Sequence, residues 1–317
     1  MGFVKSVLVW LVSFAIIFSL GYILNTISSA PKPVVDVQTI NVVGQTVFSN
    51  KSFSSDVEVV WEVLKWVEEN VMYGSTNTSR PSIKLYFGDR RYVSFAHPLD
   101  VLWSRSGVCS GFSILISTAL AYYNITSYIL VWRGFLNESG HTAVGVLVNN
   151  SFFVLDQSLP PIPYSTYVDY IYYGEPDVVF KMYRYGNDLM YKVVNLKEEV
   201  GSVLHTYSSS AQEIITEVLK KIAHEYSLVL SSEAEKGINA SIYSCIYMSY
   251  SSSRCYSEYL LYHPVFKKQW MELLEKDIKR LLGEWRNVVE VLRTYGKGEV
   301  KIWGRVDEGR LVIFLSG

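Results

Sequence analysis

The spacing of apolar residues changes along the chain, and each spacing predicts an element. From Val57 to Met72, apolar side chains recur every three or four positions behind a Ser55-x-x-Glu58 pattern, which is typical of an amphipathic helix with a capping box. A continuous apolar run from Ile114 to Tyr123 predicts a second helix. Short runs rich in β-branched and aromatic residues predict three strands, over Tyr128–Trp132, His141–Val148 and Ser151–Asp156.

The segments that flank this region have different patterns. Val34 to Phe48 is β-branched, so we expect one or two strands there. Asn77 to Tyr92 is polar and turn-rich, which predicts a loop at the mouth of a groove. The prolines at positions 160, 161 and 163 are expected to end the sheet, because proline cannot donate to a central ladder. Tyrosines crowd residues 164–191, where they either line a carbohydrate or peptide groove or pack in the core.

The last third of the chain has mainly helical spacing. Ala211–Leu230 and Pro264–Tyr295 repeat apolar residues at helical intervals, and we expect the two helices to form an antiparallel hairpin. Gly283 lies inside the second segment, where glycine costs about 1 kcal/mol relative to alanine. Glu299–Leu315 alternates around a turn at residues 307–309, which predicts a final β-hairpin.

A turn at Asn149-Asn150 sets the register of two predicted strands, because asparagine tolerates the positive φ of a two-residue hairpin turn. Pairing Val148 with Ser151 places His141 opposite Ser158, with Asp156 on the diagonal. His141 and Asp156 then point to the same side, about 7–8 Å apart between Cα atoms. We therefore expect their side chains to meet, with Cys109 facing the same surface.

Cys109 lies between two glycines, Gly107 and Gly111, directly before the apolar helix. A helix N-terminus favours an anion, so the thiol should ionise more easily than a free thiol of pKa about 8.5. Cysteine, histidine and aspartate supply a nucleophile, a general base and an orienting carboxylate.

With these residues, the segment from about 53 to 160 resembles the core of the transglutaminase-like superfamily. The likeness rests on Gly107, Cys109, His141 and Asp156, and upstream on the helix that ends near Tyr73. It implies an α+β, papain-like fold in which the cysteine helix packs on an antiparallel sheet that bears His141 and Asp156. The chain departs from many members by having Ala143 two positions after the histidine, which puts the substrate groove in doubt.

The resemblance implies a thiol enzyme that transfers or hydrolyses acyl groups at amide bonds of peptides or proteins through a Cys109 thioester. The Cys109 backbone N–H can serve in the oxyanion hole, and the second donor is unassigned, with Trp103 as a candidate. The alternative is a catalytically silent binding or scaffold protein of the cell envelope. No motif for a metal or cofactor stands out, so we expect none.

Composition excludes two classes of protein. With 49% hydrophobic and 19% charged residues, the chain is not largely disordered. The net charge of −1 lacks the basic footprint of a nucleic-acid binder.

The N-terminus predicts a membrane anchor of a prokaryotic or archaeal type. Val7 to Leu24 carry no charge and would span about 27 Å as a helix. A cleaved signal peptide is the alternative, with Ser28-Ser29-Ala30 as its cleavage site. Lys5 favours an inside N-terminus, which places the bulk of the chain in an extracytoplasmic, single-pass topology. Six Asn-x-Ser/Thr sequons fit that side of the membrane and predict a glycoprotein: Asn50, Asn77, Asn124, Asn137, Asn149 and Asn239.

Cys245 and Cys255 flank a loop rich in tyrosine and serine, and outside the cell they predict a disulfide, with two free thiols as the alternative. The expected organisation is an anchor over residues 1–30, a spacer with one or two strands over 31–52, a transglutaminase-like core over 53–165, and a mainly helical region over 166–317. The partner of that last region stays unassigned.

Overall fold

A computed structural model describes residues 33–49, 51–133, 140–171, 174–207, 209, 212–231, 239–244, 262–284, 286–295, 300–307 and 310–316. The helices are α2 (Val37–Phe48), α3 (Asp56–Asn70), α4 (Pro98–Ser104), α5 (Cys109–Tyr122), α6 (Tyr164–Thr166), α7 (Leu196–Val200), α8 (Gln212–Glu225), α9 (Lys267–Glu284) and α10 (Arg286–Tyr295). Three short turns of other helix types are η1 (Tyr167–Ile171), η2 (Gly201–His205) and η4 (Pro264–Phe266).

The strands form four sheets among the described residues. The seven-stranded sheet has the order β1 (Pro33–Val35), β11 (Asp188–Val194), β10 (Val178–Tyr185), β6 (Ser127–Trp132), β7 (His141–Val148), β8 (Ser151–Asp156) and β9 (Ser158–Pro163). The four-stranded sheet has the order β12 (Val229–Leu230), β14 (Lys301–Asp307), β15 (Arg310–Ser316) and β13 (Asn239–Ser244). The two-stranded sheets pair β2 (Met72–Tyr73) with β5 (Ser106–Gly107), and β3 (Ile83–Phe87) with β4 (Arg91–Phe95).

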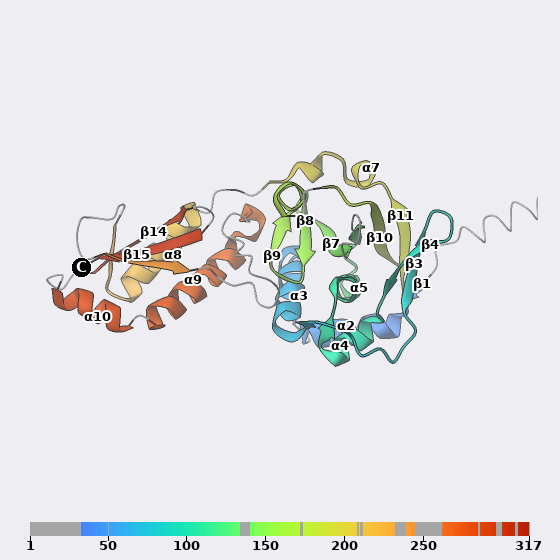
Figure 1. Cartoon of the computed structure of the whole chain (residues 1–317), viewed down its shortest axis with the longest axis horizontal. Coiled ribbons are helices and arrows are strands. Elements are labelled where there is room, and N and C mark those ends of the chain that lie inside the picture. Colours follow the sequence, from blue (N-terminus) through green and yellow to red (C-terminus); the bar gives the residue numbers. More distant parts are fainter. Residues whose placement is uncertain are drawn as a thin grey trace, which may run out of the picture.

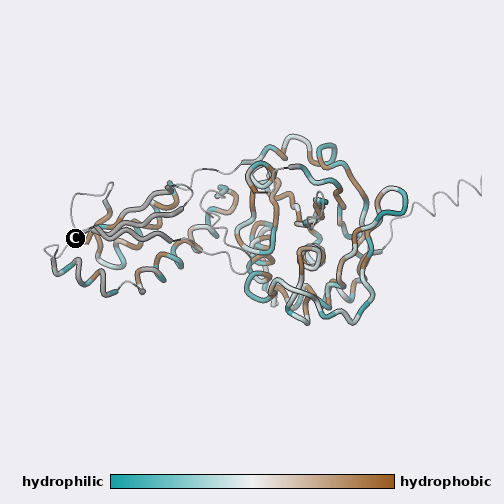
Figure 2. Tube along the Cα trace, in the orientation of Figure 1, coloured by the Kyte–Doolittle hydropathy of each residue, from teal (hydrophilic) through white to brown (hydrophobic). Residues whose placement is uncertain are grey.

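Helix α5 lies at the centre of the larger lobe, which is the part of the structure that contains the seven-stranded sheet (Figure 1). Every residue from Gly111 to Ala121 is buried, and a helix that is apolar all round has to be covered on every side. The antiparallel seven-stranded sheet lies along it, and α2, α3 and α4 also pack on it. Hydrophobic segments run through the interior of this lobe, while the turn between β3 and β4 is hydrophilic (Figure 2). The mixed helices and antiparallel sheet fit the papain-like α+β class that the sequence predicts.

Residues 34–48 correct the strand prediction, because a three-residue strand is followed by helix α2. The Asp36 carboxylate caps this helix by accepting a hydrogen bond from the Thr39 backbone N–H at 2.7 Å. Its buried face includes Ile40, Val43 and Val47 at helical spacing. The burial of that face outweighs the weak preference of β-branched residues for strands.

Two further local predictions need correction. The segment 77–92 contains most of a β3–β4 hairpin, whose Leu85 and Phe95 are buried against the sheet, so it is not an open loop. Helix α3 begins at Asp56, as expected, but Ser55 makes no side-chain cap. The Glu58 carboxylate instead accepts from the backbone N–H and the hydroxyl of Ser54, at 2.9 and 3.0 Å.

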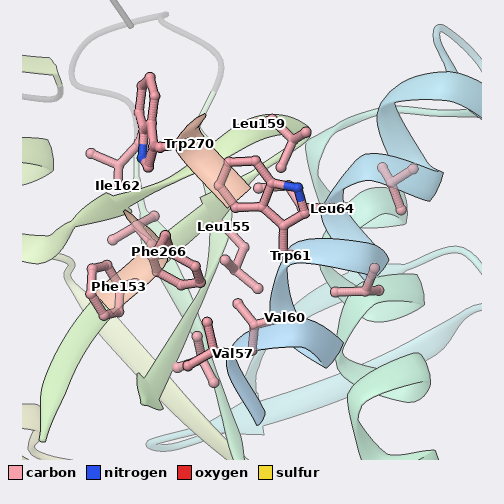
Figure 3. Close-up of a cluster of buried hydrophobic side chains, with 14 of the residues drawn as sticks. Val57, Val60, Trp61, Leu64, Phe153, Leu155, Leu159, Ile162, Phe266 and Trp270 are labelled. Carbon is pink, nitrogen blue, oxygen red and sulfur yellow. The ribbon is translucent and has the colours of Figure 1, made fainter. Parts of the chain in front are cut away.

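Turn η4 and the start of α9 pack on the larger lobe through aromatic rings (Figure 3). Phe266 lies 4.9 Å from Phe153 of β8 and 5.7 Å from Trp61 of α3, between ring centroids. Trp270, which is fully buried, lies 6.5 Å from Trp61. One continuous hydrophobic core therefore joins this C-terminal segment to α3 and β8.

Helices α8 and α9 lie side by side but run parallel, which corrects the expected antiparallel hairpin. Lys267 at the start of α9 pairs with Glu217, while Lys279 near its end pairs with Glu225 at the end of α8. Strands β12 and β13 intervene in the chain, so the helices are not consecutive elements. The final hairpin, β14 with β15, has the predicted position.

The transmembrane helix of the predicted fold class is corrected as well. Among the described residues, no helix is both long and apolar enough to cross a membrane. The apolar helix α5 would span only about 21 Å, against a hydrocarbon core of about 30 Å, and the longer α9 carries charges such as Lys267 and Lys276. The stretch Val7–Leu24 lies outside the described residues. The membrane localisation and the glycosylated outer topology therefore have no support here.

Gly44 is predicted to allow the close packing of α2 on α5. A Cβ at Gly44 would lie 2.1 Å from Cγ of Tyr122, whereas one at Gly283 in α9 would meet nothing within 4 Å. Gly44→Ala should therefore destabilise the chain by about 1–3 kcal/mol, despite the better helix propensity of alanine. Gly283→Ala, the control, should stabilise by up to about 1 kcal/mol. Urea unfolding of both variants checks this, and a stabilised Gly44→Ala variant would contradict it.

Candidate active site

The chain places Cys109 at the first position of α5, as the sequence predicts. Val108 is the N-cap residue, and the first turn holds no acidic residue that would offset the positive end of the helix dipole. A buried hydrogen bond of 3.0 Å between the Ser113 and Thr142 hydroxyls ties α5 to β7. This bond fixes the helix start beside the strand that begins at His141.

The β7–β8 hairpin has the predicted register at its turn. Val148 pairs with Ser151 across Asn149 and Asn150, whose φ angles are 47° and 58°. The expected pairing of His141 with Ser158 does not form, because the chain turns at Gln157 and Ser158 pairs with Asp156 instead. That turn leaves Asp156 at the end of β8, on the same side as His141.

The two side chains meet there. Nε2 of His141 lies 3.2 Å from Oδ2 of Asp156, and the side chains are 17% and 20% exposed. The imidazole also hydrogen-bonds the Cys109 side chain. Since Nε2 faces the carboxylate, Nδ1 is the nitrogen available to the thiol. The structure thus brings Cys109, His141 and Asp156 into one hydrogen-bonded row.

The hydrogen-bonded row changes the pKa of both Cys109 and His141. Burial alone would raise the pKa of the Cys109 thiol, but hydrogen bonds from His141 and Thr142 and the His141 charge lower it. Burial alone would lower the pKa of His141, but Asp156 and Cys109 raise it to about 10. Both shifts favour the ion pair of a thiolate beside an imidazolium.

A tyrosine completes the surroundings of the cysteine. Strand β2 pairs in parallel with β5, and Tyr73 stands opposite Gly107, two residues before Cys109. The Tyr73 hydroxyl accepts a hydrogen bond from the Cys109 backbone N–H, and its ring stacks on Phe112 at 6.2 Å. Burial and the charges of Cys109 and Asp156 raise the pKa of Tyr73, so the phenol keeps its proton.

Trp103, the sequence-based candidate for an oxyanion donor, lies near the end of α4. Its side chain is 59% exposed, and the Arg80 guanidinium lies 4.2 Å from its ring centroid. Arg80 in turn pairs with the buried carboxylate of Asp100, which also accepts from the Ser79 hydroxyl. The Trp103 indole is therefore engaged by the loop before β3.

Sequence reasoning missed two tyrosines of this site. Tyr73 reaches Cys109 only because β2 pairs with β5, a parallel contact of two residues that leaves no pattern in the chain. Tyr167 is fully buried, and its hydroxyl donates to Oδ2 of Asp156 at 2.7 Å. Tyr167 lies in the tyrosine-rich stretch 164–191, whose sequence is compatible with either a groove lining or core packing.

The predicted disulfide partners Cys245 and Cys255 lie outside the described residues. No cluster of metal-ligating side chains occurs in the part of the chain that the structure describes.

Comparison with known proteins supports the same domain. Residues 40–182 match the family model DUF553, which is described as a transglutaminase-like domain. A UPF0252 protein of Archaeoglobus fulgidus is 27% identical over 112 residues, which cover 33% of this chain and 35% of that protein. A UPF0252 protein of Pyrococcus horikoshii is 26% identical over 110 residues, which cover 34% and 31%. The chain thus spans about a third of the length of these relatives.

Structural comparison gives only a weak likeness. A solved structure from Cytophaga hutchinsonii, proposed to be a cysteine protease, aligns with 52% of this chain and 54% of its own, at 15% identity and a TM-score of 0.27. Residues 40–182 are therefore similar to a transglutaminase-like domain, and the family match supports a fold of the thiol-enzyme type there.

The ion pair predicts an unusual pH profile for Cys109. Because its pKa is lowered, iodoacetamide should alkylate Cys109 faster at pH 6 than it alkylates a free thiol, which is only about 0.3% ionised at that pH. His141→Ala should move the rise in alkylation rate to higher pH, since the imidazolium no longer stabilises the thiolate. The test is to measure alkylation rates of both proteins between about pH 4 and 10, with free cysteine as the reference. Identical profiles for both proteins would contradict the ion pair.

Proposed function

We propose that the transglutaminase-like domain is the catalytic domain of a thiol enzyme that transfers or hydrolyses acyl groups at amide bonds of peptides or proteins. The observation that carries the proposal is the row Cys109, His141 and Asp156, in which the pKa of the thiol is lowered and that of the imidazole is raised. Such a row supplies a nucleophile and an acid at the same pH.

In the first step, the Cys109 thiolate attacks the amide carbonyl carbon and forms a C–S bond. The carbonyl π electrons move to oxygen, which gives a tetrahedral oxyanion. When this intermediate collapses, the C–N bond breaks, and the His141 imidazolium gives its proton to the leaving amine. The products of the step are a Cys109 thioester, a neutral imidazole and a free amine.

In the second step, the neutral His141 takes a proton from water or from an acceptor amine. The activated nucleophile attacks the thioester carbonyl, and the C–S bond breaks as the thiolate leaves. Asp156 holds the imidazole in orientation and stabilises its positive charge in both steps. Water yields hydrolysis and an amine yields transfer, so access of the acceptor decides between the two outcomes.

The oxyanion needs two donors, and Tyr73 suits the second place better than Trp103. The Cys109 backbone N–H is one donor, and the Tyr73 hydroxyl occupies the position to which this N–H points. A carbonyl oxygen that enters between them would accept from both, because the phenol keeps its proton. The Trp103 ring is instead contacted on one face by the Arg80 guanidinium.

The scaffold alternative has less support. A binding protein gains nothing from a partly buried thiolate and imidazolium, because taking charged groups out of water costs free energy. The presence of both groups beside the orienting carboxylate favours turnover.

The proposal predicts an acyl-enzyme on Cys109. The full-length protein mixed with p-nitrophenyl acetate should release a burst of p-nitrophenolate that does not exceed the concentration of protein, and peptide mapping should find the acetyl group on Cys109. Cys109→Ala should abolish the burst, and His141→Ala should slow it by roughly 100- to 10,000-fold. Glycinamide in the deacylation buffer separates transfer from hydrolysis. A burst that survives Cys109→Ala would overturn the assignment.

The oxyanion assignment has its own test. Tyr73→Phe keeps the ring on Phe112 but removes the hydroxyl, so acylation should slow by roughly 100- to 1,000-fold, as when an oxyanion donor is lost. Alkylation by iodoacetamide forms no oxyanion and should change far less. Trp103→Phe serves as the matched comparison. Should Trp103→Phe lose acylation while Tyr73→Phe retains it, the second donor is Trp103.

A further inference from the structure

Tyr167 contacts both His141 and Asp156 at a single point. Its hydroxyl donates to Oδ2 of Asp156 at 2.7 Å and lies 3.1 Å from Nε2 of His141. Nε2 itself lies 3.2 Å from the same Oδ2. The three polar atoms therefore form a closed triangle at the end of the row that is farthest from the thiol.

The frame around Tyr167 is rigid. The residue is 0% exposed and begins a π-helical turn, η1, a type of helix often found at functional sites. Its ring lies 5.6 Å from that of Trp132, which lies 6.2 Å from the His141 ring. The Trp132 indole N–H donates to the Gly174 carbonyl at 2.8 Å, and the Gly174 N–H donates to Val168 at 3.0 Å. The phenol thus reaches Asp156 from a fixed position.

The Asp156 carboxylate makes its hydrogen bonds to other described residues through Oδ2. Oδ1 is buried and accepts no hydrogen bond from the described residues. The hydrogen bonds that orient the carboxylate among these residues are those from Tyr167 and His141, and both end on Oδ2. Without the Tyr167 hydroxyl, the imidazole that Asp156 must orient would be the remaining hydrogen-bonding partner.

We propose that Tyr167 is a positioning residue for the thiol site, whose hydroxyl holds Asp156 at Nε2 of His141 and thereby fixes the imidazole against Cys109. The inference rests on the proposed function and extends it by one residue. Tyr167 does not touch the reacting atoms and acts through Asp156. The ionisable groups that face this imidazole are Cys109 and Asp156, with Tyr73 beside them.

The same segment supplies a matched control. Tyr164 is also buried, at 3% exposed, and packs on Phe152 at 5.6 Å between ring centroids. Its hydroxyl donates to Glu175 at 2.6 Å and not to a group of the row. Tyr167→Phe and Tyr164→Phe each remove one buried hydroxyl, but only the first loosens Asp156.

The experiment measures acylation by p-nitrophenyl acetate and the pH profile of Cys109 alkylation by iodoacetamide, in full-length protein, below the melting transitions of all variants. Tyr167→Phe should slow acylation by roughly 10- to 100-fold, a loss of the size seen when a residue that orients a site residue by a hydrogen bond is removed. The pH at which alkylation rises should shift upward, since a loosely held imidazolium stabilises the thiolate less. Tyr164→Phe should leave both readouts near wild type.

A double mutant separates positioning from packing. In an Asp156→Asn background, Tyr167→Phe should add little to the loss of acylation, because both changes break the same link. An additive loss, equal shifts in Tyr164→Phe, or a wild-type profile in Tyr167→Phe would each overturn the inference. If wild-type protein itself shows no burst and a free-thiol profile, the proposed function fails, and that outcome is distinct from the others.

Discussion

The burial of α5 is the constraint on which the rest of the larger lobe depends. Residues 111–121 are all buried, so the helix has no face for solvent and must be enclosed by the sheet and by α2, α3 and α4. A helix enclosed in this way cannot slide or rotate without losing contacts on several sides at once. The start of α5, where the helix leaves the core, is consequently held in place by this packing, and Cys109 occupies it.

The site is assembled where several elements end. Helix α5 and strand β7 begin there, and strands β8 and β2 end there, so backbone ends and not loops present the four groups Cys109, His141, Asp156 and Tyr73. Element ends combine a rigid anchor with partial access to solvent. His141 and Asp156 keep 17% and 20% exposure, which leaves room for a substrate while burial still strengthens the electrostatic interactions.

The seam between α3 and α9 combines an apolar core with two buried carboxylates. Phe266 and Trp270 fill the apolar part, while burial raises the pKa of both Glu68 and Asp277. A raised carboxyl pKa in the folded chain contributes stability below the unfolded pKa of about 4, and this contribution is lost as pH rises through the folded value. The seam is therefore held at neutral pH by its aromatic packing and by the Leu159 N–H that donates to Glu68.

The sequence by itself determined the parts of this protein that depend on neighbours in the chain. The Gly-bracketed Cys109 opens a helix because an apolar run follows it, and Asn149-Asn150 sets the β7–β8 register because a two-residue turn leaves one pairing. Only the tertiary structure decided contacts between distant segments. Tyr73 reaches Cys109 through β2 and β5, Tyr167 reaches Asp156 across a buried turn, and α2 is a helix because burial of Ile40 and Val43 outweighs local propensity. Such contacts depend on which surfaces the folded chain brings together, and spacing along the sequence carries no record of that.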